Sequence, residues 1–375
     1  MTLTYTATCL FGLEGLLGEE IKSLGYERKG SIDGRITFAG DEYTPARFNI
    51  RSRYAERLYL NLGSFRAETF TDLFDGTYAL PWEEIIGKED SYPVSGHSIK
   101  SKLFSVPDCQ KIIKKAVSKR LGEKYSVTRL PETGISYRIE FFIFKDTADL
   151  MIDLSGQPLH KRGYRPERVT APIRETLAAA MVALARPREN VLLWDPFCGS
   201  GTIAIEAAMM MKNIAPGMKR HFAFEEFPLF PGDSYPHEVA RAESEIRDTG
   251  FEAYATDIDP ECVRIATESA ARAGVSDIVS CFEMDALDID TMGRRGTVVT
   301  NPPYGERLSS REEAEELYRA MGQAFGRLEK WQIYVITENE KFQSLFGRKA
   351  DKIRKMYNGM IPCLYYQFFK QIGHK

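Results

Sequence analysis

The sequence predicts an α/β protein whose C-terminal half forms a mostly parallel, doubly wound sheet, and three observations support this fold class. Val191–Met211 contains an apolar strand, a turn with two glycines and a helix rich in Ala and Met. Strand-like and helical segments then alternate from residue 251 to residue 337. Finally, the segments 352–357 and 363–370 flank an Asn-Gly pair, which is typical of a β-hairpin. We therefore expect a parallel sheet that ends in an antiparallel hairpin.

Length and composition indicate a multidomain globular protein. The chain has 375 residues, enough for two or three domains, and it is 43% hydrophobic and 27% charged. Its formal net charge of −3 means that any nucleic-acid-binding surface must be local. The six cysteines are scattered and the five histidines form no ligand-spaced cluster, so we expect no metal and a reducing cytoplasm. We also expect no signal peptide and no membrane span.

The chain divides into three predicted segments. Residues 1–158 alternate short strands and helices and are expected to form an N-terminal α+β region. Residues 159–170 are a basic linker, and residues 171–375 form the doubly wound domain. The irregular stretch 213–236 is long for a connector, so it is either functional or mobile. Oligomeric state is left open.

A basic helix is predicted within residues 97–124. Eight Lys or Arg residues are opposed by only two acids in this stretch. The pattern fits either a solvated helix face or a patch that contacts phosphates. The sequence HSIKSKLFSVPDCQKIIKKAVSKRL, between predicted strands, resembles a THUMP domain, an RNA-binding module. The candidate RNA contacts here are Lys100, Lys102, Lys111, Lys114 and Lys115.

The junction 159–165 is a second candidate RNA contact. Lys161, Arg162 and Arg165 surround Tyr164 in this short segment. It is either a plain linker or a surface that stacks on and neutralises single-stranded RNA.

The glycine turn after the first strand of the sheet has neither the Lys of a phosphate-binding P-loop nor the third glycine of a dinucleotide fingerprint. The sequence DPFCGSGT instead resembles the motif of class I methyltransferases that use S-adenosylmethionine (SAM). That family has a Rossmann-like, mostly parallel seven-stranded sheet with a C-terminal antiparallel hairpin, as expected here. The resemblance implies a SAM site formed by Pro172, Thr176, Asp195, Pro196, Phe197, Cys198, Gly199, Gly201, Thr202, Asp257, Ile258, Asp285, Ala286 and Asn301.

Four polar residues are expected at the carboxyl ends of parallel strands, where doubly wound folds bind ligands. They are Asp195, Asp257, Asp285 and Asn301. Asp257 is placed to accept hydrogen bonds from the ribose hydroxyls, and Asp285 to accept one from an adenine amino group. Each carboxylate alone could equally be a helix cap.

The segment Asn301–Tyr304 resembles the N-P-P-Y motif of methyltransferases that act on exocyclic amino groups of bases. An aromatic amine is a poor nucleophile because its lone pair is delocalised. The Asn301 side-chain oxygen and the Pro302 carbonyl can accept its two N–H bonds, while Pro302 and Pro303 stiffen the loop. Tyr304 can stack on an extruded base. The motif does not distinguish adenine N6, cytosine N4 and guanine N2.

Over essentially its full length the chain resembles the THUMP-containing RNA guanine-N2 methyltransferases, in particular the N-terminal methyltransferase part of those that modify bacterial 23S ribosomal RNA. The resemblance implies a SAM-dependent enzyme that methylates the N2 amine of a guanine in 23S rRNA. The resemblance includes no second, C-terminal methyltransferase domain, so we do not expect a dual activity from it. The alternatives are a tRNA guanine or a DNA or RNA adenine as target, and a non-catalytic RNA-binding or ribosome-assembly factor.

Overall fold

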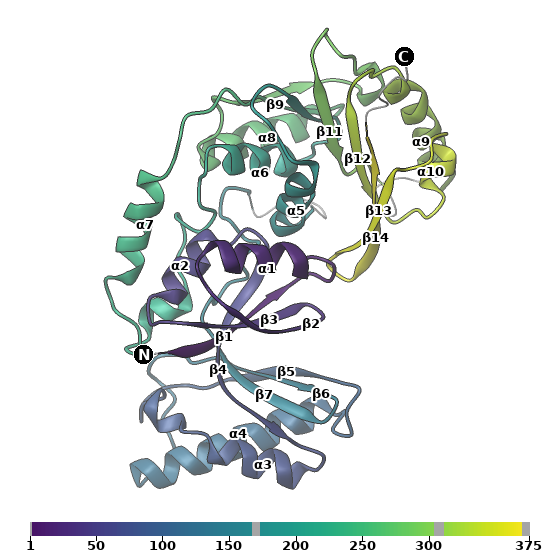
Figure 1. Cartoon of the computed structure of the whole chain (residues 1–375). Coiled ribbons are helices and arrows are strands. Elements are labelled where there is room, and N and C mark those ends of the chain that lie inside the picture. Colours follow the sequence, from purple (N-terminus) through teal and green to yellow (C-terminus); the bar gives the residue numbers. More distant parts are fainter. Residues whose placement is uncertain (1, 167–172, 304–310, 370–375) are drawn as a thin grey trace.

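The computed structural model describes residues 2–166, 173–303 and 311–369, which form two seven-stranded sheets with their helices (Figure 1). The first sheet and helices α3 and α4 occupy the lower half of Figure 1, and the second sheet occupies the upper half. The predicted division of the chain at residues 158 and 171 stays a prediction.

The first sheet has the strand order β2-β3-β1-β4-β7-β6-β5, and its long central strand β4 joins two small α+β units. β4 pairs with β1 over its first half and with β7 from Tyr59 to Arg66. Neither unit therefore has an open strand edge where they meet. The elements are β1 (Leu3–Cys9), α1 (Glu14–Ser23), β2 (Arg28–Ile32), β3 (Arg35–Gly40), α2 (Thr44–Arg51), β4 (Ala55–Arg66), α3 (Phe70–Ala79), η1 (Trp82–Glu84), β5 (Val94–Ile99), α4 (Val106–Tyr125), β6 (Ile139–Phe144) and β7 (Thr147–Asp153).

The helices of the first half each bury one apolar stripe. Leu17 and Ile21 of α1 are fully buried, as are Ile113, Val117 and Leu121 of α4. These residues recur at four-residue intervals, so a single face of each helix meets the core. In α4 the lysines therefore occupy the remaining faces.

The second sheet has the order β10-β9-β8-β11-β12-β14-β13, which confirms the expected class I methyltransferase architecture. Strands β10, β9, β8, β11 and β12 pair in parallel, and β14 pairs antiparallel with both β12 and β13. The predicted hairpin turns at Gly359, whose φ of 66° favours glycine. The elements are α5 (Glu175–Ala185), β8 (Leu192–Asp195), α6 (Thr202–Met211), η2 (Ala223–Glu226), α7 (Ser234–Ser244), β9 (Ala253–Asp257), α8 (Pro260–Ala273), β10 (Val279–Glu283), η3 (Ala286–Asp288), β11 (Gly296–Thr300), α9 (Arg311–Gly326), β12 (Gln332–Thr337), α10 (Phe342–Leu345), β13 (Lys352–Asn358) and β14 (Ile361–Phe368).

The irregular stretch 213–236 packs against the first half. The Gly217 N–H donates to the carbonyl of Ile50 at 2.8 Å, and the ring of Phe227 stacks on that of Tyr137 with centroids 4.4 Å apart. Helix α7, which follows, packs against α2. The stretch therefore braces the two halves against each other.

Candidate active site

A cavity of about 810 Å³ opens at the carboxyl edge of the parallel strands of the second sheet. Most of the predicted site residues share one property, which is that they line this cavity. They are Asp195, Pro196, Phe197, Cys198, Gly199, Thr202, Asp257, Ile258, Asp285, Ala286, Asn301 and Pro303. Their contact with a cofactor or substrate stays a prediction.

The glycine turn is tied to the neighbouring strand and leaves room for a ligand. Gly199 and Gly201 have φ values of 52° and 76°, in the left-handed region that glycine tolerates. A Cβ on Gly201 would lie 3.0 Å from the Cβ of Ala266 in α8, so this glycine permits close helix packing. A Cβ on Gly199 would meet nothing within 4 Å. Gly199 therefore borders the cavity, whereas Gly201 does not line it.

Asp257 ends β9 and is held in place by backbone donors. Its Oδ2 accepts from the Gly199 N–H at 2.9 Å, and its Oδ1 accepts from the Asp259 N–H at 3.1 Å. A carboxylate oxygen has a second lone pair, so each can also accept from a ligand hydroxyl. Next to it, the apolar side chain of Ile258 is 67% exposed and faces the same cavity. This arrangement suits a ribose beside a flat apolar base.

Asp195 ends β8 and is almost completely buried. Its Oδ1 accepts from the Thr300 hydroxyl at 2.7 Å and from the Phe197 N–H at 3.3 Å. Burial raises the pKa of the Asp195 carboxyl to about 7, the Thr300 hydrogen bond opposes that shift, and the nearby Asp257 adds to it. The charge of Asp195 therefore changes near neutral pH.

Asn301 follows β11 and is 6% exposed. Its Oδ1 is buried and has no hydrogen-bond partner among the described residues. Leaving a buried carbonyl oxygen unpaired costs about 1–3 kcal/mol, so a ligand donor is the natural partner. The loop after it is anchored at Pro303, whose carbonyl accepts from the Tyr318 hydroxyl at 3.4 Å. Pro302 is buried but does not line the cavity.

Asp285 and Thr176 occupy positions that differ from those the sequence predicts. Asp285 does not end a strand, because β10 stops at Glu283, and Asp285 instead caps η3 through the Leu287 N–H at 2.9 Å. It still lies on the cavity wall. Thr176 was expected at the cofactor, but it does not line this cavity: it is fully buried and donates to Glu56 of β4 at 2.6 Å, so its cofactor contact stays a prediction. The expected contacts of Pro172 and Tyr304 lie outside the described residues.

Sequence reasoning missed part of the wall. Glu261, Cys262 and Ile265 of α8 line the cavity, together with Ile173 and Leu317. The first turn of a helix that follows a ligand-binding strand end faces the same crevice. The position of Asp257 could therefore have pointed to these α8 residues.

Two of the four expected RNA contacts in the junction, Arg162 and Tyr164, are buried, which argues against the expectation for these two residues. Arg162 is 3% exposed and donates to the carbonyls of Leu159 and Arg53 at 2.7 and 2.6 Å. Tyr164 is 4% exposed, and its hydroxyl donates to Glu206 at 3.0 Å. Burial of these side chains leaves no face for a nucleotide.

Arg165 is also largely buried and acts inside the protein. It forms an ion pair with Glu175 at 2.9 Å and donates to the Ile173 carbonyl and the Thr202 hydroxyl at 2.9 and 3.2 Å. Ile173 and Thr202 both line the cavity, so Arg165 positions part of its wall. Lys161 remains exposed.

The lysines of the basic helix differ in accessibility. Lys111 and Lys115 are exposed, and Lys111 lies 3.7 Å from Asp108 of the same helix. Lys114 is half-buried, forms an ion pair with Glu132 at 2.6 Å and packs over the ring of Tyr92. Exposed ion pairs are weak, so Lys111 and Lys115 are open to phosphate contact and Lys114 is partly committed to the fold.

The two lysines before the helix are both exposed. Lys100 is exposed, and Lys102 forms an ion pair with Glu68.

Within the described ranges, no helix has the length and apolar character needed to cross a membrane, and no group of three or more His, Cys, Asp or Glu residues is arranged to hold a metal ion.

The fold and the cavity define a class I SAM-dependent methyltransferase. Comparison with known proteins extends this. Residues 4–59 match the RlmL ferredoxin-like domain, residues 67–153 match the THUMP domain, and residues 162–367 match the RMKL-like methyltransferase domain. The chain therefore belongs to the family of THUMP-containing RNA methyltransferases that carry an RMKL-like catalytic domain.

Individual relatives agree with this family. The chain is 42% identical to the protein named "Putative RNA methyltransferase YpsC" of Bacillus subtilis (strain 168), over 98% of this chain and 96% of that protein. It is 32% identical to ribosomal RNA large subunit methyltransferase K/L of Psychromonas ingrahamii over 96% of this chain, and it spans about half of that relative (49%). The crystal structure of SMU.472 complexed with SAH is 38% identical, covers 100% of this chain and 99% of that one, and has a TM-score of 0.91. SAM is thus the cofactor.

Proposed function

We propose that the protein methylates the exocyclic N2 amine of a guanine in RNA, with 23S ribosomal RNA as its substrate and the cytoplasm as its compartment. The observation that carries the proposal is the buried Oδ1 of Asn301 on the wall of the cavity, which has no hydrogen-bond partner among the residues that the structure describes. An amino group that approaches this oxygen gives it the donor that it lacks. The name of the large subunit K/L relative supports ribosomal RNA as the substrate.

The residues of the cavity suit both the cofactor and the amine. When bound, SAM supplies an electrophilic methyl group. Asp257 would hold the ribose hydroxyls, and Ile258 and Asp285 would border the adenine. Asn301 would accept one N–H of the amine. Acceptors fixed before the reaction cost no reorganisation during it, which is how such a site lowers a barrier.

The test is methyl transfer from tritiated SAM to 23S rRNA purified from a strain that lacks this protein, followed by nucleoside mass spectrometry. N2-methylguanosine is the expected product, and tRNA assayed in parallel should remain unlabelled. N6-methyladenosine would overturn the guanine assignment, and labelled tRNA alone would overturn the choice of rRNA. SAM binding without transfer to any RNA would favour a non-catalytic assembly factor.

A further inference from the structure

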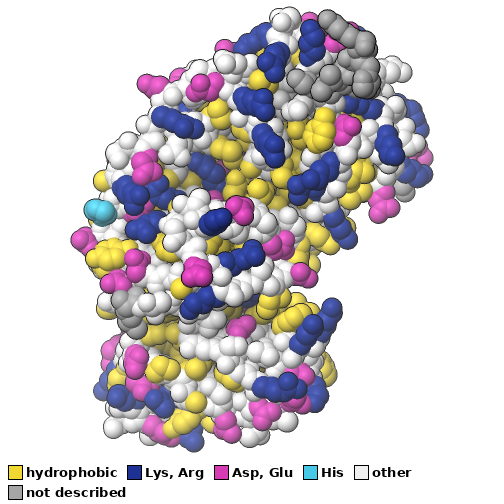
Figure 2. Space-filling view, viewed as in Figure 1, with side chains coloured by type: hydrophobic (Ala, Val, Ile, Leu, Met, Phe, Trp, Pro, Cys, Tyr) yellow, Lys and Arg dark blue, Asp and Glu magenta, His cyan; other side chains and the backbone are white. Residues whose placement is uncertain are grey.

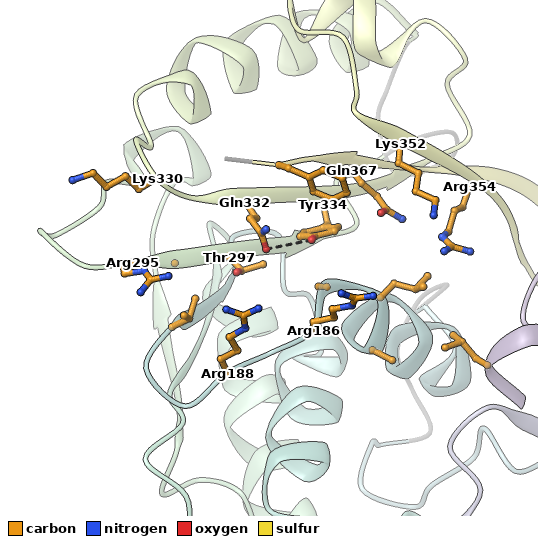
Figure 3. A pocket seen from close by; sticks show the side chains of 17 residues that line it. Arg186, Arg188, Arg295, Thr297, Lys330, Gln332, Tyr334, Lys352, Arg354 and Gln367 are labelled. Carbon is orange, nitrogen blue, oxygen red and sulfur yellow. Dashed lines mark hydrogen bonds between the residues drawn. The ribbon is translucent and has the colours of Figure 1, made fainter. Parts of the chain in front are cut away.

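A second hollow, of about 620 Å³, lies at the amino edge of the same sheet. Figure 3 shows it between the end of α5 and the strands β11 to β14. Arg186 and Arg188 form its lower wall in this view, and Lys352 and Arg354 of the hairpin form its upper right wall. The hollow is distinct from the catalytic cavity, with which it shares no lining residue.

The two sites lie at opposite ends of one strand. Arg295 directly precedes β11 and lines the hollow, whereas Asn301 directly follows β11 and lines the catalytic cavity. A five-residue strand spans about 16 Å at 3.3 Å per residue. A group bound in the hollow therefore cannot be the base that Asn301 contacts.

The lining of the hollow is cationic. Six of its residues are Lys or Arg, and none of the described lining residues is acidic: the six are Arg186, Arg188, Arg295, Lys330, Lys352 and Arg354. Within the described part of the chain, none of the six makes an ion pair, unlike Lys102 and Lys114 of the first half. Figure 2 shows Lys and Arg side chains gathered over this part of the molecule, with few acidic side chains among them. A cluster of one charge sign raises the local concentration of anions, so this surface favours an anionic ligand.

Besides its charged residues, the hollow is lined by one buried side-chain amide, that of Gln367. Gln367 is 3% exposed, and its Nε2 has no hydrogen-bond partner among the described residues. The strand register places Gln367 directly between Tyr334 and Lys352, so the three side chains share one face of the sheet. Tyr334 donates its hydroxyl to the Gln332 amide oxygen at 3.3 Å. The Nε of Arg354 is likewise buried without a partner.

The unsatisfied groups are all donors, and the ligand must therefore be an acceptor. Guanidinium, ammonium and amide NH₂ groups donate hydrogen bonds, and phosphodiester oxygens only accept them. The cations lie after α5, just before β11 and β12, and in β13. The edge from β8 to β13 spans about 19 Å at 4.8 Å per strand. Phosphates along one strand of a nucleic acid helix rise about 3.4 Å each, so this edge can meet several in succession.

We propose that this hollow binds the phosphate backbone of the RNA substrate, at a place distant from the nucleotide that is methylated. The inference rests on the proposed function to the extent that RNA is the substrate. RNA held here and at the catalytic cavity contacts both edges of one sheet, so the backbone passes around the methyltransferase half of the protein.

The first test is charge reversal of three exposed residues, in the variant Arg188→Glu/Arg295→Glu/Lys330→Glu. The matched control reverses three exposed lysines outside the hollow, Lys22→Glu/Lys29→Glu/Lys341→Glu. Affinity for an rRNA transcript is measured by filter binding across a salt series. The hollow variant should bind at least about tenfold more weakly than the control, and the slope of log K against log[salt] should fall by about 2–3 because three phosphate contacts are lost. Equal affinities and slopes for the two variants would overturn the proposal.

A second variant separates the site from simple surface charge. Gln367→Met keeps the size of a buried side chain and removes an unpaired donor, so a purely structural role predicts an equal or higher thermal midpoint and unchanged RNA affinity. The proposal predicts that RNA affinity falls about two- to tenfold although the midpoint does not fall. Unchanged affinity would overturn the role of Gln367.

Further measurements test whether the ligand of the hollow is RNA or a free nucleotide, and they test the proposed function independently of the hollow. ATP is titrated calorimetrically into the wild-type protein and the hollow variant. The RNA assignment would be overturned in favour of a free nucleotide if the wild type binds ATP saturably, the variant loses this binding, and the RNA affinity of the variant is unchanged. SAH affinity should be equal in all variants. If the wild-type protein transfers no methyl group to RNA, the proposed function fails, whereas unchanged RNA binding by the hollow variant refutes only this inference.

Discussion

Asp195→Asn should change how the stability of the protein depends on pH. The pKa of Asp195 is about 7 against an ordinary 3.8, so the native state retains a proton that the unfolded chain releases above pH 4. Its contribution to stability is therefore full below pH 4 and is lost as pH rises through 7. About three pKa units correspond to roughly 4 kcal/mol in total, of which about 2–3 kcal/mol is lost between pH 5 and pH 8.

The asparagine variant cannot ionise and lacks this loss. Urea unfolding of both proteins at pH 5 and pH 8 gives the difference in free energy of unfolding, from which the other titrating groups cancel. That difference should shift by about 2–3 kcal/mol in favour of the variant at pH 8. Thr300→Val removes the hydrogen bond that favours the charged carboxyl, so it should move the loss to higher pH. Parallel pH profiles for wild type and Asp195→Asn would refute the reasoning.

The same carboxyl links proton release to cofactor binding. SAM carries a positively charged sulfonium, and a cation close to Asp195 lowers its pKa and expels its proton. Calorimetry of SAM binding at pH 7 in two buffers of different ionisation enthalpy should therefore reveal proton release that Asp195→Asn abolishes. Equal apparent enthalpies for the wild type in both buffers would place the cofactor's charge away from Asp195.

Four further predictions concern individual residues. Asn301→Ala should lower the rate of methyl transfer by ~10²-fold or more with little change in thermal midpoint, because its Oδ1 has no partner to lose. Asp257→Ala should weaken SAM binding measured by calorimetry by about 1.5–3 kcal/mol, the range for hydrogen bonds to a charged group. Reversing Lys111 and Lys115 to Glu should weaken RNA binding and flatten its salt dependence while SAM binding stays constant; an unchanged salt slope would show a solvated face only. Arg162→Ala should lower the free energy of unfolding by about 3–5 kcal/mol, since it removes the ion-pair partner of the buried Glu206 carboxylate, and weaker RNA affinity with unchanged stability would contradict the burial argument.

Features encoded by local patterns could be predicted from the sequence. The strand, glycine turn and helix at 191–211, the alternation after residue 251 and the Asn-Gly hairpin each depend on neighbouring residues, and each is found in the structure. The cluster of polar side chains at the carboxyl edge followed from the same reasoning, because parallel strands end at a common edge.

The features that could not be predicted depend on contacts between residues that are far apart in the sequence. Arg162 and Tyr164 are residue types that suit an RNA-binding junction. Both instead donate to the buried carboxylate of Glu206, more than 40 residues later, and lie in the core. Thr176 likewise donates its hydroxyl to Glu56, 120 residues earlier, and does not line the cavity. The cations of the second hollow lie in segments up to 168 residues apart, from 186 to 354, so no local run of charge revealed them.

The two edges of the second sheet differ in the charge of the residues that line them. Five carboxylic acids and no described Lys or Arg line the catalytic cavity. Such a lining attracts a cationic cofactor and repels phosphates, so the cavity itself contributes little to holding RNA. If the protein extrudes a base, as proposed, the few kcal/mol that this costs would come from phosphate contacts elsewhere on the protein. Under the proposals above, the cationic hollow and the exposed lysines of α4 would contribute to these contacts. The loss of the sulfonium charge on methyl transfer would then weaken the hold of the acidic cavity on the spent cofactor.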